Sequence, residues 1–182
     1  TGSPVSGGPK SYDVTANGLD VDHLSRRAMD LHFKAMADTL IDDAGDLTGK
    51  TLKYLHCDSV ETGKVNWSGE FREEFQKRRG YDLLPYLPVL VGKLVDSREV
   101  SNRFLYDFRK TFADCIAENH YGRFQELCHS RGLQYHAESG GPPPLPIDAL
   151  QCLGKTDIPM GEFWCPGCSF AWRVYSCSCM GP

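Results

Sequence analysis

The sequence predicts an α/β fold in which parallel strands alternate with helices. Helical patterns separate three short strand patterns along the chain, and a helix between two strands is the usual crossover between parallel neighbours. Each of the three strands also ends at or near a glutamate: Glu61, Glu138 or Glu162. Sites in parallel α/β folds lie at the carboxyl ends of the strands. We therefore expect adjacent or near-adjacent parallel strands that bring these three carboxylates to one end of the sheet.

Composition excludes several classes of protein. The 182 residues include 20 basic and 24 acidic side chains, for a formal charge of −4, whereas a nucleic-acid-binding protein usually carries a basic excess. The longest strongly apolar run, Leu83 to Val91, contains two prolines and is too short to span a bilayer. No signal-peptide pattern follows Thr1. These features predict no nucleic-acid or membrane partner.

The first helix is predicted from Leu24 to Ala44, with Ser25 or Asp22 as its N-cap and Gly45 as its stop. It follows an irregular segment, residues 1–18, that is rich in Gly, Ser, Pro and Asn. Apolar residues recur at helical spacing and predict which side of the helix is buried. They form two adjacent stripes: Leu24, Ala28, Leu31 and Ala35, and beside them Met29, Phe33, Met36 and Leu40.

The middle of the chain predicts a strand, a helix and an irregular segment. Thr51 to Cys57 has the pattern of a short buried strand. Ser68 can cap the helix that follows, which has acidic residues in its first turn, basic residues in its last, and Gly80 directly after it. Pro85 and Pro88 are expected to make the next segment irregular.

The second half predicts a long helix, or two abutting helices, from Arg98 to Arg131, which Gly132 ends. A second strand, Leu133 to Glu138, leads to a short helical turn at Ile147 to Leu150 and a third strand, Asp157 to Trp164. The predicted organisation is an irregular start (1–18), a catalytic region (19–164) and a Cys-rich tail of unknown structure (165–182).

Eight cysteines fall into two groups. Four are scattered and are expected to be small buried hydrophobic side chains: Cys57, Cys115, Cys128 and Cys152. Four lie in the tail, at Cys165, Cys168, Cys177 and Cys179. The first tail pair has zinc-ligand spacing, but the second is too tight for the usual knuckle. No helix or strand pattern supports a zinc module there, so a divergent, truncated or frame-shifted end is the other interpretation.

Polar and aromatic residues surround the strand-end glutamates. Asp58, Asn66 and Trp67 flank Glu61, and Trp164 follows Glu162. Alternation puts His136 on the same face as Glu138, where it serves either the site or the packing. Aromatic rings cover sugar C–H surfaces while carboxylates bond hydroxyls or move protons, and glycoside cleavage needs one carboxyl as acid and another to activate water or attack. We take these residues as candidate catalytic and substrate-binding groups.

The chain resembles glycoside hydrolase family 106, the α-L-rhamnosidases, over roughly residues 15 to 164. The matching stretches are Leu55–Glu61, Asn66–Trp67, Glu74–Pro88, Gly132–Pro142 and Asp157–Trp164. The resemblance implies a (β/α)8 TIM-type barrel, inverting hydrolysis of terminal α-L-rhamnosides, a calcium ion, and an extracellular or periplasmic location. It implies Glu61 as the general acid and Glu138 or Glu162 as the base. The family usually has Trp where this chain has Val60.

The predicted strands are too few for a complete barrel, which takes about 250 residues. We therefore expect a partial barrel that acts within a longer parent on a rhamnose-containing oligosaccharide or glycoside. The alternatives are an incomplete, non-catalytic barrel fragment, a weak carbohydrate-binding module, and a zinc-stabilised module built on the tail cysteines.

Overall fold

The computed structural model describes residues 21–58, 60, 67–139, 147–163 and 175–177. The helical elements are α1 (Arg26–His32), the π-helical η1 (Phe33–Ala37), α2 (Asp38–Ala44), the 3₁₀ helices η2 (Gly45–Leu47) and η3 (Leu84–Val91), α3 (Phe71–Arg79), α4 (Arg98–Cys115), the π-helical η4 (Ile116–Gly122), α5 (Arg123–Ser130) and α6 (Ala149–Leu153). The strands are β1 (Tyr54–Cys57), β2 (Gln134–Glu138), β3 (Ile158–Phe163) and β4 (Tyr175–Cys177).

The sheet has the order β1-β2-β3-β4. β1 pairs with β2 in parallel and β2 with β3 in parallel, so the expectation of adjacent parallel strands is confirmed. Helices α3, α4 and α5 lie between β1 and β2 along the chain, and α6 lies between β2 and β3. The chain therefore has an α/β fold in which helical crossovers connect the three parallel strands β1, β2 and β3.

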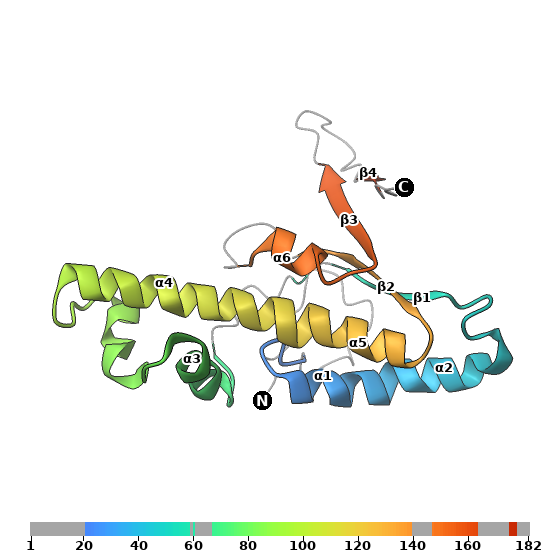
Figure 1. Ribbon diagram of the computed structural model, residues 1–182, viewed down its shortest axis with the longest axis horizontal. Coiled ribbons are helices and arrows are strands. Elements are labelled where there is room, and N and C mark those ends of the chain that lie inside the picture. Colours follow the sequence, from blue (N-terminus) through green and yellow to red (C-terminus); the bar gives the residue numbers. More distant parts are fainter. Residues whose placement is uncertain (1–20, 59, 61–66, 140–146, 164–174, 178–182) are drawn as a thin grey trace, which may run out of the picture.

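A long helical rod lies between two other layers. Elements α4, η4 and α5 follow one another without a break, confirming the long helix predicted from Arg98. Figure 1 shows this rod with α1 and α2 on one side and the sheet on the other. Phe124 of α5 joins the layers, because its ring centroid lies 5.3 Å from that of Phe33 and 4.8 Å from that of Tyr135. All three side chains are buried.

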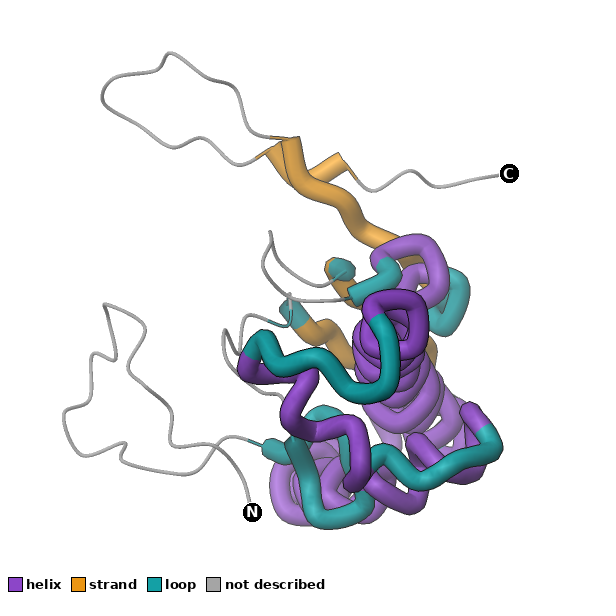
Figure 2. The backbone as a smooth tube through the Cα atoms, turned by 90° about the vertical axis from the view of Figure 1, so that its left-hand side faces the viewer, coloured by secondary structure: helices purple, strands orange, loops and turns teal. Residues whose placement is uncertain are grey.

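The helices cover only one face of the sheet. On β2, Tyr135 and Ala137 are buried toward the rod, whereas Gln134 is exposed and His136 is half-buried. Tyr54, the register partner of Gln134, is also exposed. Figure 2 shows the described helices gathered to one side of the strands. Within the described residues, the face that carries Tyr54 and Gln134 is therefore not covered by a helix.

The first helix has the expected bounds but a different buried side. Ser25 caps it, accepting the Ala28 N–H at 3.2 Å, and Gly45 ends it at a φ of +50°. The buried residues are spaced by four: Met29, Phe33, Ala37 and Ile41. Leu31, Met36 and Leu40, which we predicted in the stripes, are exposed instead. Helical spacing alone fits several overlapping stripes, and packing against α5 and η4 selects this one.

The next two elements also differ in detail from the prediction. Helix α3 starts at Phe71 rather than directly after Ser68, whose hydroxyl accepts the N–H of Glu70 at 3.3 Å. Its acidic start, basic end and left-handed Gly80 are as expected. The segment around Pro85 and Pro88 is a 3₁₀ helix rather than irregular, because the fixed φ of proline is compatible with 3₁₀ geometry.

The tail contains a strand that the sequence did not predict. β4 pairs antiparallel with β3, with Glu162 opposite Ser176 and Phe163 opposite Tyr175. The expectation that the tail has no strand is therefore wrong at Tyr175–Cys177. A three-residue strand is too short to give a period-2 pattern, and its pairing with β3 is a tertiary contact. Cys165, Cys168 and Cys179 lie outside the described residues.

Asp157 ties the start of β3 to β2 and α5. Its carboxylate accepts the Tyr135 N–H at 2.7 Å and the Gln125 amide at 3.0 Å, and it lies 2.9 Å from Nε2 of His129. Partial burial raises the pKa of Asp157, but these hydrogen bonds outweigh it and hold the pKa below its usual value. The charged carboxylate therefore stabilises the edge where the strands enter the sheet.

We expect Asp157→Asn to lower the free energy of unfolding at neutral pH by about 2 kcal/mol, because hydrogen bonds to a charged acceptor are lost. A lowered pKa contributes stability above the unfolded pKa of about 3.9, and that stability is lost as pH falls through the folded pKa. The difference in free energy of unfolding between the variant and the wild type should thus become smaller below about pH 4. Urea unfolding across pH measures this, with the exposed Asp43→Asn as control. A difference in free energy of unfolding that stays constant down to about pH 2 would contradict the stabilising role of the charged Asp157 carboxylate.

Candidate functional site

The parallel register aligns the carboxyl ends of three strands. Cys57, the last residue of β1, is opposite Ala137, and Glu138, the last residue of β2, is opposite Met160. Asp58 therefore follows β1 at the level where Glu138 ends β2. Along the backbone of β3, Glu162 lies two residues beyond Met160. The strand ends thus bring the positions of Asp58, Glu138 and Glu162 to one end of the sheet, the "mouth".

Tyr121 of η4 lies beneath the mouth and was not singled out in the sequence. Its hydroxyl donates to the backbone carbonyl of Glu138 at 2.9 Å, and its side chain is fully buried. Burial raises the pKa of Tyr121, and the carboxylates of Glu138 and Asp58 add to that rise. The hydroxyl therefore stays protonated and fixes the end of β2. The sequence around Tyr121 gave no signal, because only the fold brings this helical residue to the end of a strand.

The two mouth carboxylates that the structure describes have different surroundings. Glu138 is only 5% exposed, whereas Asp58 is exposed. The pair therefore offers one rigid, partly desolvated group and one solvated group at the same end of the sheet.

Two imidazoles lie one layer below Glu138, on the face without helices. His56 and His136 are register partners, and their ring centroids are 4.5 Å apart. Burial lowers the pKa of His136, and the neighbouring His56 lowers it further, so His136 is neutral near pH 7. Its Nε2 is buried and has no hydrogen-bond partner among the described residues.

Trp67 and Val60 border the loop after β1. Trp67, a predicted substrate-binding residue, is 43% exposed and its ring packs at 5.6 Å from that of Phe71. Helix α3 therefore holds an aromatic surface that remains open to solvent. Val60, where the resembling family usually has Trp, is buried in the core. The chain thus contributes a small buried side chain at this position.

Several predicted site residues belong to parts of the chain that the structure does not describe. Glu61, Asn66 and Trp164 lie outside the described residues, and only the backbone of Glu162 is described. Among the described residues there is no group of three His, Cys, Asp or Glu side chains that could hold a metal ion. A calcium ion takes six to eight oxygen ligands, so Asp58 and Glu138 do not make a calcium site by themselves.

The four scattered cysteines offer no reactive thiolate. Cys115, Cys128 and Cys152 are buried and Cys57 is half-buried, close to the expectation of small buried hydrophobic side chains. Burial raises the pKa of Cys57 to about 11 and that of each of the other three to about 12. Thiols with such pKa values stay protonated near neutral pH and are poor nucleophiles. The chemistry of the described mouth thus rests on carboxylates and imidazoles.

Comparison with known proteins gives three findings. The family model for α-L-rhamnosidases of glycoside hydrolase family 106 matches residues 7–176. A Formosa agariphila protein named "Putative beta-glucuronidase" is 41% identical over 154 residues, which are 85% of this chain and 13% of that protein. The solved structure of a rhamnosidase from Novosphingobium sp. PP1Y matches with a TM-score of 0.72 and 38% identity, covering 78% of this chain and 14% of that one. The chain thus spans about one seventh of the length of these relatives.

No described helix is long and apolar enough to cross a membrane.

The bond from Tyr121 to the end of β2 can be tested by deletion of one oxygen. We expect Tyr121→Phe to remove the hydrogen bond from the Tyr121 hydroxyl to the Glu138 carbonyl and to lower the free energy of unfolding by about 1 kcal/mol. For a chain of this size the melting temperature should fall by about 2–4 °C. Tyr106→Phe is the matched control, because Tyr106 is 66% exposed. Equal melting temperatures for the two variants would show that the bond adds nothing.

Proposed function

The chain belongs to the α-L-rhamnosidases of glycoside hydrolase family 106, and we propose from this premise that it forms part of the catalytic barrel of a longer glycosidase. The observation that carries the proposal is the alignment of Asp58, Glu138 and the Glu162 backbone at one end of parallel strands. Glycosidases need two carboxyl groups on either side of the scissile bond, and the carboxyl ends of the strands are where such groups gather in barrels.

We assign Glu61 as the general acid, which protonates the leaving oxygen. Glu138 or Glu162 acts as the general base that activates a water molecule from the other side of the sugar. An inverting enzyme keeps these carboxyls about 6.5–9.5 Å apart to leave room for that water. Burial and the bond from Tyr121 to its carbonyl support Glu138 as a rigidly held partner. Asp58, Asn66, Trp67, His136 and Trp164 are the proposed substrate-binding residues.

The proposed substrate is a terminal α-L-rhamnoside in an oligosaccharide or glycoside. The family model and the Novosphingobium structure support this sugar, while the name of the Formosa relative points to a β-glucuronide. Aryl glycosides of the two sugars separate these substrates directly. Cleavage of the glucuronide alone would replace the rhamnoside in this proposal.

A second proposal is that the 182-residue chain by itself is a non-catalytic fragment or a weak carbohydrate-binding module. The uncovered sheet face favours it, since Tyr54 and His56 of β1 are exposed there. In a closed barrel the inward side chains of all strands fill the interior in layers and hold the site rigidly. Small displacements of catalytic groups can cost about a hundredfold in rate, so we expect no turnover by the isolated chain.

We also propose calcium binding, but only for the complete mouth of the longer polypeptide, where further oxygen ligands join Asp58. An ion that binds the folded state raises its stability. The melting temperature of the longer polypeptide should therefore rise with added calcium and fall with a chelator, with magnesium as control. Identical melting curves under all three conditions would contradict a bound calcium ion.

The general acid can be identified through its dependence on the leaving group. In the longer polypeptide, Glu61→Gln should abolish cleavage of natural rhamnosides, which need protonation of the leaving oxygen. Cleavage of an activated aryl rhamnoside should fall much less, because its leaving group departs without a proton. Values of kcat/KM for both substrates measure the difference.

Glu138→Gln is the matched comparison, since loss of a base should slow both substrates to a similar degree. Small and equal losses for Glu61→Gln on both substrates would exclude it as the acid. Turnover by the isolated 182-residue chain that disappears in its Glu61→Gln variant would show that this chain forms an active site by itself and would contradict the non-catalytic fragment.

A further inference from the structure

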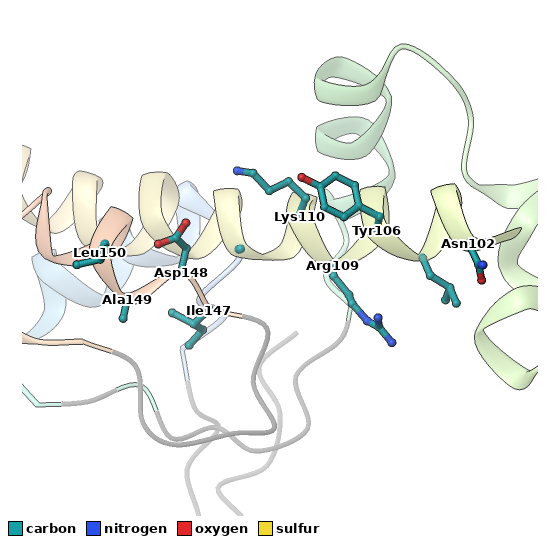
Figure 3. Close-up of a pocket in the computed structure, with 10 residues that line it drawn as sticks. Asn102, Tyr106, Arg109, Lys110, Ile147, Asp148, Ala149 and Leu150 are labelled. Atoms are coloured by element: carbon teal, nitrogen blue, oxygen red, sulfur yellow. The ribbon is translucent and has the colours of Figure 1, made fainter. Parts of the chain in front are cut away.

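A groove of about 710 Å³ lies between α4 and the segment that begins α6. We call it the α4 groove; Asn102, Tyr106 and Arg109 line it from α4, and Ile147, Asp148 and Leu150 line it from the other side. Figure 3 shows the Tyr106 ring and the Arg109 side chain on opposite edges of the α4 surface that forms the groove. The volume is within the range of about 300–1,000 Å³ that small-molecule sites occupy.

The α4 side of the groove is one continuous stripe. Asn102, Tyr106 and Arg109 are spaced by four and three residues, so they are neighbours on the helix surface. All three are exposed, Tyr106 by 66%. Exposure of the apolar Tyr106 ring to water is unfavourable, and a ligand that covers the ring would remove this cost. With polar side chains beside it on the same face, the ring suits a ligand that has both a flat apolar surface and polar groups.

The charges in the groove leave one cation available. Lys110 is paired with Asp114, and the Asp148 carboxylate accepts the N–H of Gln151 at 3.0 Å at the start of α6. Arg109 has no ion-pair partner among the described residues, although other arginines of the helical layers do, such as Arg79 with Asp114. A guanidinium binds a carboxylate through two parallel hydrogen bonds, so Arg109 favours an anionic ligand.

The α4 groove is separate from the mouth. Tyr121 marks the level of the mouth, since it binds the end of β2, and the rod runs antiparallel to β2 because α5 leads into the start of that strand. Arg109 precedes Tyr121 by twelve residues and therefore lies about 18 Å farther along the rod, beyond the strand end. Figure 1 shows α4 extending past the ends of β1 and β2. A ligand here would contact a part of a glycan remote from the bond that is cleaved.

We propose that the α4 groove is a binding subsite for a carboxylate-bearing sugar unit, a uronic acid, of the glycan substrate. The Tyr106 ring covers the C–H face of the sugar, Arg109 binds its carboxylate, and Asn102 bonds a hydroxyl. The choice of a sugar as ligand rests on the proposed glycosidase function, whereas the preference for a carboxylate rests on Arg109. Binding of a remote sugar unit can orient the substrate and contribute to transition-state stabilisation at the mouth.

The test is a titration of the 182-residue chain with methyl β-D-glucuronide and methyl β-D-glucoside, followed by ¹H–¹⁵N NMR shifts of α4 residues. The two probes differ only in the carboxylate. We expect the glucuronide to bind about tenfold more tightly than the glucoside. Arg109→Gln should remove that preference and leave glucoside binding unchanged, while Tyr106→Ala should weaken both probes.

Arg27→Gln is the matched control, because Arg27 is an exposed helical arginine outside the groove; this variant should bind as wild type does. All three changes are at exposed positions, and circular dichroism with thermal melts checks that each variant folds. The subsite is overturned if neither probe shifts α4 residues, if both bind equally to wild type, or if Arg27→Gln loses the preference as Arg109→Gln does.

A failure of the proposed glycosidase function can be distinguished experimentally from a failure of the proposed subsite. Rhamnoside cleavage by the longer polypeptide is measured separately on a short aryl rhamnoside, and Arg27→Gln, a change outside both sites, should alter that kcat by less than twofold. Absent turnover with intact glucuronide preference contradicts the proposed function and supports the subsite. Normal turnover without any glucuronide preference overturns the subsite alone.

Discussion

The contact of the Phe124 ring with Phe33 on one side and Tyr135 on the other sets the arrangement of the whole chain. These three buried side chains come from the first helix, the long rod and the central strand, so they hold three layers at fixed positions. Aromatic pairs at these separations add to the free energy gained by burying their large apolar surface. Once Tyr135 faces the rod, alternation along β2 requires His136 and Glu138 to take the other side.

That division gives the two faces of β2 separate roles. The face toward the rod carries the core, including Tyr135 and Ala137, while the opposite face carries the imidazole of His136 below the carboxylate of Glu138. Asp157 fixes the entry of the strand by accepting the Tyr135 N–H, and Tyr121 fixes its end by donating to Glu138. Both fixing groups lie on other elements. A site built on a strand that is held at both ends is more precise than one carried by a loop.

The rod extends the proposed functional surface beyond the mouth. Its α5 half supports the sheet, whereas its α4 half passes the strand ends and presents Tyr106 and Arg109 beside the segment that begins α6. Enzymes that act on long glycans use binding energy from units remote from the reaction to orient the reacting sugar. The same helix thus supports the proposed catalytic end and carries the proposed subsite.

The sequence by itself determined the order of the main helices and of β1, β2 and β3, the parallel pairing of these three strands and the position of a glutamate at or near the end of each. These features follow from hydrophobic period, capping residues and the need for crossovers. The long helix was predictable for the same reason, as were the glycine stops at Gly45, Gly80 and Gly132. Its motifs also led to the family that the chain belongs to.

Only the tertiary structure decided which of several overlapping stripes on the first helix is buried, leaving Leu31 and Leu40 exposed. It alone revealed β4, the partnership of Tyr121 with Glu138, and the α4 groove. The physical reason is the same in each case. Local sequence patterns reflect only the conformational and burial preferences of a residue within its own helix or strand. These features depend instead on contacts between residues that are distant in sequence and that the packing of the layers brings together.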